Sequence, residues 1–442
     1  MSHSNPSLMK KVNRKIINAL VRYTYICLLS FFYTPDNIAQ IQAPEPSASA
    51  AFTESQIIQL ALKYSPTIQS LGTSVKIAEY RLKSSGRIRN PELRISDVST
   101  RYYTEEFDKL RTGLRWRLPQ PGELGEEKQQ ARVEYWEKQV DAIRNRQKFI
   151  TDMRKDFADV LMYDRLAELE QQRLTKETER ESIIEALFNM GNRTVVQYFK
   201  AKMEHMESQN DLDRILKNQK TARRRLAGLT HIQENSTLVA DELPEIPDEL
   251  AALVTLAVQN RPEIELEKQR SALAGKKKKA EYMKLIPWPS FIEISYHMEK
   301  VRDRDWGEFM AGINLPLFNW NGGNIKASNL VVEKRTREYK ATMESLENEV
   351  RSAYLNYSDR LIELKNFRNN AGKLISYADT LTQEAGQHGT LMADEILEIE
   401  LTVIETEKLL AEKRRNLSCA LADLYNALGI EGYEEFSLKD LQ

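Results

Sequence analysis

Residues 113–125 read GLRWRLPQPGELG, and residues 312–323 read GINLPLFNWNGG. Both stretches close an apolar–polar alternation with Leu-Pro and then reach a glycine ahead of a long run with helical periodicity. The likeness continues downstream, where MRKDFADVLMYDRL (153–166) recurs as VRSAYLNYSDRL (350–361). The matching segments follow one order at an offset of about 197 residues, so the chain contains one structural unit twice.

The repeat organises the chain into segments. We predict one repeat at residues 52–232 and a second at residues 251–430, joined by a Pro-containing linker at 241–250. Residues 431–442 are expected to form a C-terminal tail. Each repeat has the same layout: a short helix, two strand-like runs and two long helices.

The strand-like runs alternate with period two, which is typical of a sheet with one apolar and one polar face. In residues 110–118 the apolar residues alternate with Arg111, Gly113, Arg115 and Arg117. In the second repeat Ile292, Ile294, Tyr296 and Met298 alternate with Glu293, Ser295 and His297, and residues 309–315 repeat the pattern. Charged links are expected at residues 104–109 and 301–306. Aromatic residues lie near the strand ends, as in the girdle of a membrane barrel: Tyr102, Tyr103, Trp116, Trp288 and Trp306.

The long runs have heptad-like spacing. Residues 126–185 contain no Pro or Gly, and roughly 60 residues of helix would span about 90 Å. A helix of that length needs partner helices along its length. Gly191 and Gly389 lie among polar residues, where we expect each helical hairpin to turn. The predicted fold class is therefore a mixed α and β membrane protein with long antiparallel α-helical hairpins and two β-hairpins per chain.

The N-terminal segment has the pattern of a secretory signal peptide. Five basic residues precede an apolar run at residues 23–33, and small residues follow at Ala39 and Ala43. We predict a signal peptide over residues 1–39, cut near 39–43; the alternative is a buried N-terminal helix. Of the two cysteines, Cys27 would leave with this segment and Cys419 would remain as a single thiol. No later run reaches transmembrane-helix length, so a membrane span would consist of strands.

Charge and motifs exclude several functions. The sequence has 64 Lys+Arg and 65 Asp+Glu, a balance that argues against a nucleic-acid partner. It contains no HExxH, GxSxG or CxxC motif, so we predict neither an enzyme nor a cofactor or metal site. The basic run at residues 276–279 would contact anionic lipid head groups or simply form a solvated helix face.

Four strands cannot close a barrel. Open edges in hydrocarbon leave backbone groups unpaired, at a cost of several kcal/mol each. If these strands lie in a membrane, several chains must share one barrel.

The sequence resembles the TolC-like outer-membrane efflux proteins over about residues 52–430. The segments that carry the resemblance are LPQPGELG (118–125), LPLFNWNGG (315–323), LFNMGNRTVVQYFKAK (187–202) and ALADLYNALGI (420–430). The resemblance implies a homotrimer with a shared transmembrane β-barrel in the outer membrane of a Gram-negative bacterium and a helical tunnel in the periplasm. It also implies a periplasmic adaptor and an inner-membrane pump of RND or ABC type.

In this family the channel is a passive conduit, here for small toxic compounds, drugs or metal ions. Two alternatives stay open: the outer-membrane component of a type I protein secretion system, and a periplasmic coiled-coil scaffold that never enters a membrane. The resemblance also places a periplasmic gate at the hairpin turns. The matching residues here are Gly191, Asn192, Arg193, Thr194, Gln197, Gly389, Thr390, Asp394 and Glu395.

We expect Arg193 to pair with Asp394 or Glu395 and hold the entrance shut; the alternative is ordinary solvated turn charges. The candidate residues of the barrel lumen are Arg111, Arg115, Arg117, Glu293 and His297. Their arginines would favour anions in transit, unless they are paired with Glu293 or other neighbours across the wall.

Overall fold

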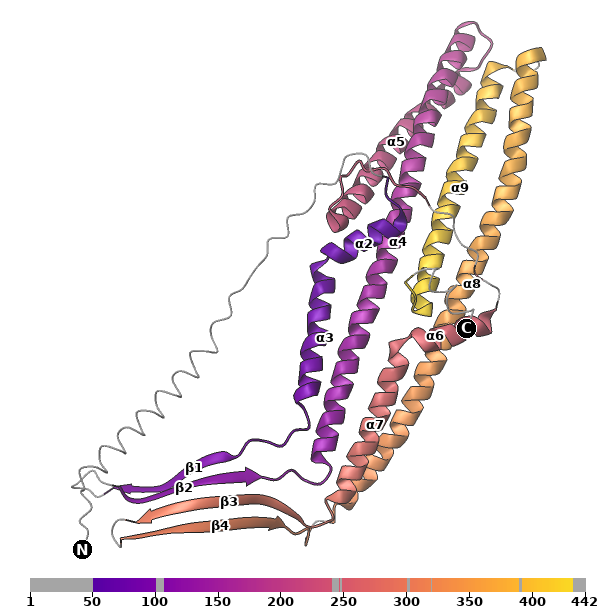
Figure 1. Ribbon diagram of the computed structural model, residues 1–442. Helices are drawn as coiled ribbons and strands as arrows, with labels where there is room; N and C mark the ends of the chain where they lie inside the picture. The colour runs from indigo at the N-terminus through magenta and orange to yellow at the C-terminus, as the bar shows by residue number, and fades with distance from the viewer. Residues whose placement is uncertain are drawn as a thin grey trace. The chain divides into compact units, whose positions relative to one another are not determined.

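A computed structural model of the chain describes residues 51–100, 107–240, 246, 249–299, 303–318, 320–388 and 392–431. The predicted signal peptide, nearly all of the linker and tail, Tyr102, Tyr103, Gly389 and Thr390 lie outside these residues. The described part of the chain contains eight helices and four strands, with the two repeats in the same order (Figure 1).

The elements of the first repeat are α2 (Glu54–Tyr64), α3 (Pro66–Ser84), β1 (Glu92–Thr100), β2 (Phe107–Arg117), α4 (Glu123–Asn189) and α5 (Val195–Thr230). Those of the second are α6 (Leu250–Asn260), α7 (Pro262–Met283), β3 (Trp288–Glu299), β4 (Arg304–Asn314), α8 (Gly322–His388) and α9 (Ala393–Leu428). The long helices have equal lengths in the two copies, 67 residues for α4 and α8 and 36 for α5 and α9. This correspondence is what an internal duplication produces.

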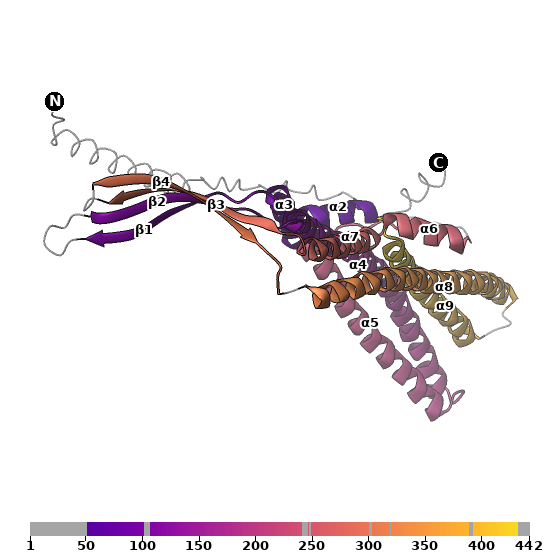
Figure 2. The same cartoon turned by 90° about the horizontal axis from the view of Figure 1, so that it is seen from below.

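The four strands form one antiparallel sheet in the order β1-β2-β3-β4 (Figure 1, Figure 2). The two hairpins meet where β2 pairs with β3, with Arg115 opposite Glu293. The predicted links at 104–109 and 301–306 are wrong in extent, because Phe107 pairs with Thr100 and Asp305 with Met298. Charged side chains at the ends of a hairpin reach water without breaking the backbone ladder, so pairing continues past the apolar pattern.

Each repeat has its own apolar core. In the first, Ile57 and Ala61 of α2 pack with Phe157 and Val160 of α4 and with Leu226 of α5. In the second, the corresponding helices α6, α8 and α9 form an equivalent cluster. Helix α4 also packs against α3, α7 and α9, so it joins the two repeats.

The turn of the first helical hairpin follows from one glycine. Gly191 has φ +77°, a left-handed conformation that other residues rarely adopt. Its N–H donates to the Phe188 carbonyl at 2.9 Å, and the Asn192 N–H donates to the Leu187 carbonyl at 2.8 Å. These bonds satisfy the end of α4. Thr194 is the N-cap of helix α5, and its hydroxyl accepts from the Gln197 N–H. Within the described ranges, no helix is apolar and long enough to traverse a bilayer.

Candidate functional site

The strand register gives the sheet two unlike faces. On one face Leu93, Leu114, Ile294 and Phe309 form a row across all four strands. Each of these four side chains is 54–69% exposed. An exposed apolar surface that crosses a whole sheet is unusual for a face in water and is typical of a binding or lipid-facing surface.

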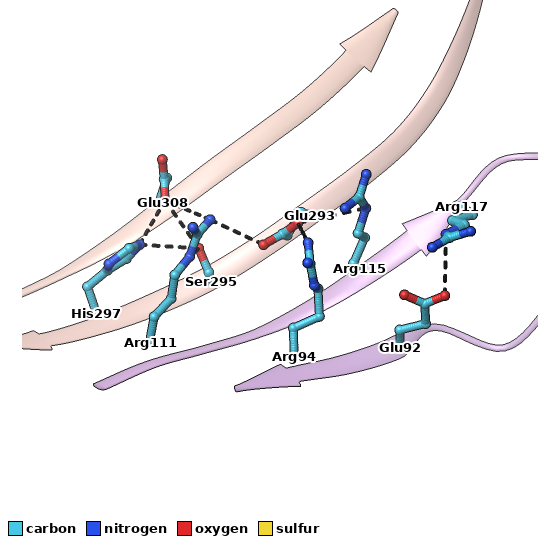
Figure 3. A network of polar contacts seen from close by, with 9 residues as sticks. All are labelled: Glu92, Arg94, Arg111, Arg115, Arg117, Glu293, Ser295, His297 and Glu308. Carbon is cyan, nitrogen blue, oxygen red and sulfur yellow. Dashed lines mark hydrogen bonds and ion pairs between the residues drawn. The ribbon is translucent and has the colours of Figure 1, made fainter. Parts of the chain in front are cut away.

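The opposite face has a network of charged residues around Glu293 (Figure 3). Glu293 is only 4% exposed. Its carboxylate forms ion pairs with Arg111 at 3.2 Å, Arg94 at 3.4 Å and Arg115 at 3.9 Å. The three guanidinium groups compensate this nearly buried carboxylate and join β1, β2 and β3.

The network extends to β4 through Glu308. This carboxylate lies 3.1 Å from Arg111 and 2.7 Å from the His297 Nε2 atom. The imidazole of His297 also stacks on Trp306, with ring centroids 4.7 Å apart. Arg117 lies apart from the network and pairs with Glu92 at 3.3 Å (Figure 3).

All five predicted lumen residues therefore lie on one face of the sheet, as the alternation indicates. Arg111, Arg115 and Arg117 are each paired with a carboxylate, which is the alternative that the sequence left open. Arg94 and Glu308 also belong to this face and were not among the predicted residues. Both could have been found, because Arg94 alternates with Leu93 and Ile95, and Glu308 with Phe309.

At the hairpin turns, the structure brings Arg193 and Asp394 together as an ion pair. The two side chains are only 22% and 13% exposed, so water screens the pair less than it screens an open surface pair. The carboxylate of Glu395 instead accepts the Met392 N–H at 2.8 Å at the start of α9. Thr194 and Gln197 cap α5, and Asn192 takes part in the turn through its backbone.

Further ion pairs continue from this contact along α4 and α9. We call this set the α4–α9 seam: Lys155–Asp423 at 2.6 Å, Asp159–Arg415 at 2.6 Å, Arg165–Glu407 at 2.5 Å, Glu170–Lys408 at 2.9 Å and Lys176–Glu400 at 2.9 Å. Because α4 and α9 belong to different repeats, the seam joins the two helical hairpins.

One residue of the seam is deeply buried. Glu170 is 0% exposed, and its carboxylate also accepts from the Ser208 hydroxyl of α5 and from Arg173. Burial lowers the pKa of Lys408, but hydrogen bonds to Glu170 and Glu405 outweigh it and the net shift is upward. Lys408 therefore stays charged and compensates Glu170. About two helical turns further along α4, Glu177 has its pKa raised, mainly by burial.

In the part of the chain that the structure describes, no three His, Cys, Asp or Glu side chains are grouped to hold a metal ion. The main features of the described residues are therefore a sheet with one apolar and one charged face, and two helical hairpins joined by ion pairs between side chains.

The fold is that of the TolC-like outer-membrane factors. The solved structure of CusC matches with a TM-score of 0.70 and 15% identity, over 89% of this chain and 96% of that chain. The outer membrane protein VceC of Vibrio cholerae matches with a TM-score of 0.66 and 16% identity, over 85% and 96%. The CmeC outer membrane channel of Campylobacter jejuni matches with a TM-score of 0.66 and 13% identity, over 90% and 92%. No protein-family model and no curated protein matches the sequence. At these identities the likeness is one of fold, and function needs its own argument.

Proposed function

We propose that this chain is the outer-membrane channel subunit of a tripartite efflux or export system, a passive conduit without enzymatic activity. The observation that carries the proposal is the sheet, whose exposed apolar face and charged opposite face fit lipid and an aqueous lumen. The fold shared with outer-membrane channels supports it. The cell outer membrane of a Gram-negative bacterium, with the helices in the periplasm, is the corresponding location.

The open sheet edges support assembly into a homotrimer. Strands β1 and β4 each pair on one side within the chain, and an unpaired edge cannot persist in hydrocarbon. Joining β4 of one copy to β1 of the next closes the cylinder; resemblance to the family gives the number three. The outer helices carry exposed apolar side chains that fit the same arrangement, including Phe199 and Met203 on α5 and Leu355 and Ile362 on α8.

Paired arginines in the lumen support weak ion selectivity. Three copies would place nine arginines from β2 around the channel, but Glu293, Glu308 and Glu92 neutralise much of their field. We therefore expect only a small preference for anions, measured as the reversal potential in a salt gradient. The cargo class remains small toxic compounds, drugs or metal ions, delivered by an adaptor and an RND or ABC pump.

The contact between Arg193 and Asp394 supports a gate at the hairpin turns. It joins the first turn to the start of α9 near the second turn, so breaking it loosens the two hairpins at their turns while the seam still joins them further along. This role follows the gate position that the family resemblance implies.

Planar-bilayer recording tests both proposals. The purified mature chain should migrate as a trimer in detergent and form channels of low open probability. Arg193→Ala should raise the open probability, and so should Asp394→Ala. Because both substitutions break the same ion pair, the double variant should have the same open probability as either single variant. Arg214→Ala is the matched control, because Arg214 is 70% exposed and, among the described residues, forms an ion pair only with Asp211 of the same helix.

A water-soluble monomer without detergent would overturn the channel and favour the periplasmic scaffold. If channels form but gate identically in the wild type and in both variants, the proposed channel stands and the proposed gate is wrong.

A further inference from the structure

The linkers between sheet and helices all leave the same end of the sheet. Glu92 at the start of β1 pairs with Arg115 near the end of β2, and Trp288 at the start of β3 pairs with Asn314 at the end of β4. The linkers at residues 85–91, 118–122, 284–287 and 315–318 therefore all join the sheet at this one end of the strands.

These linkers expose large apolar side chains. Phe318 is 97% exposed, Trp320 75% and Leu317 63%. Ile88 and Ile286, from two other linkers, are also more than half exposed. Short connecting segments usually carry polar residues, so an apolar and aromatic set here calls for a non-aqueous neighbour. The set adjoins the exposed apolar face of the sheet, which ends at the same edge.

The basic run of α7 lies beside these linkers. Asn321 donates to the Glu281 side chain at 2.6 Å and to its carbonyl at 3.0 Å. Gly122 lies directly against Ala280, since a methyl group added to it would come within 3.1 Å. Lys276, Lys277 and Lys279 precede Glu281 by two to five residues, so they lie within about 8 Å of it along the helix axis.

These lysines are free to bind something else. Lys276, Lys277 and Lys279 are exposed, and no acidic residue of the described ranges forms an ion pair with them. Beside the lysines, the buried positions of α7 are Ala274 and Ala280, so the three exposed lysines lie off the packed side of the helix. Exposed Arg87, in the linker before β1, adds a further charge at this level.

We infer that the lysines of α7 and the apolar linker residues form a docking surface for the anionic phospholipid head groups of the inner leaflet. The inference rests on the proposed function, which puts the sheet in the bilayer. Lys side chains extend to phosphate while their stems lie on apolar surface, and aromatic residues such as Trp320 favour the interface. Exposed positive charge beside exposed apolar side chains is the combination that an anionic lipid surface complements.

Lipid quenching tests the surface in the intact channel. The purified channel is reconstituted into phosphatidylcholine vesicles containing increasing fractions of brominated phosphatidylglycerol, and quenching of its tryptophans gives the relative association constant. At low salt, we expect the association constant for brominated phosphatidylglycerol to be at least roughly threefold that for brominated phosphatidylcholine. The preference should disappear at high salt and in the Lys276→Gln/Lys277→Gln/Lys279→Gln variant.

The matched control is Lys217→Gln/Lys220→Gln/Lys373→Gln, which removes three exposed lysines from α5 and α8 and should keep the preference. Trp320→Phe should reduce the fraction of fluorescence that brominated lipid quenches. Unchanged quenching in that variant would place Trp320 against another copy and overturn the inference.

Conductance is recorded on the same vesicles fused to a planar bilayer. Conducting channels with equal affinity for the two lipids would overturn the docking surface alone. A preparation that never conducts would overturn the proposed function instead.

Discussion

The two halves of α4 join the second repeat through different contacts, because only the half near the sheet adds an apolar cluster to its ion pairs. Near the sheet, Val133 and Val140 of α4 form an apolar cluster with Leu266 of α7, flanked by Trp136. Two ion pairs, Glu137–Arg270 and Arg144–Glu263, join the same helices. From Lys155 onward the partner of α4 in the second repeat is α9, and the contacts are the ion pairs of the seam. None of the apolar clusters formed by the described residues spans α4 and α9.

This difference indicates where the repeats can separate. Burial of apolar surface is lost in full when two helices part, whereas ions that part can regain water. An exposed pair contributes only about 0–1 kcal/mol. We therefore expect movement between the hairpins at the seam and the turns, and a fixed arrangement beside the sheet.

The largest effect is expected in the apolar half. Leu266 is 7% exposed, and Leu266→Ala should lower the free energy of unfolding by about 2–5 kcal/mol, because it removes buried methyl groups and leaves a cavity. The measurement is the midpoint of unfolding by guanidinium in detergent, with the unfolding monitored by circular dichroism. Leu409→Ala on α9, where the side chain is 41% exposed, serves as control and should cost less than about 1 kcal/mol. Equal losses at both sites would erase the distinction between the two halves.

The next effect concerns the one buried pair of the seam. Lys408→Met should destabilise the protein by about 2–3 kcal/mol, because it leaves the Glu170 carboxylate buried with less compensation. The Glu170→Gln/Lys408→Met double variant should recover most of this loss. Arg165→Met, which breaks the more exposed pair with Glu407, should cost less than about 1 kcal/mol. A double variant as unstable as Lys408→Met would contradict this account of the pair.

The smallest effect is a pH dependence at Glu177. Burial raises the pKa of this carboxyl above 4.5 in the folded protein, so the folded state binds its proton more tightly than the unfolded state. Stability from this group is therefore lost as the pH rises from 4.5 through the folded pKa. Glu177→Gln should be more stable than the wild type at pH 7, and the gain should vanish below pH 4.5. Denaturant midpoints between pH 4 and 8 provide the check, and a gain that does not depend on pH would point to packing instead.

Much of the fold was predictable because its signals are local. The absence of Pro and Gly over residues 126–185 predicts a helix, and α4 extends it to Glu123–Asn189. Alternation in β2 and β3 assigned each side chain to a face, since a strand has a strict period of two. The hairpin links were less predictable, because backbone pairing tolerates polar side chains at strand ends.

The contacts across the sheet depend on which strands, far apart in the sequence, pair with one another. That Arg111 meets Glu293 requires β2 to pair with β3, and the strands are separated by all of the first helical hairpin. Similarly, the sequence left both Asp394 and Glu395 as possible partners of Arg193. Helix capping decides the choice, because Glu395 binds the Met392 N–H at the start of α9.

The sequence by itself determined the duplicated layout, the long helices, the turn at Gly191 and the two faces of the sheet, since periodicity and backbone preference act over a few residues. Only the tertiary structure decided which strands join, which carboxylates neutralise the arginines, and that an apolar cluster joins α4 to the second repeat beside the sheet but not along the seam. Those choices depend on residues far apart in the chain, whose distances no local pattern encodes.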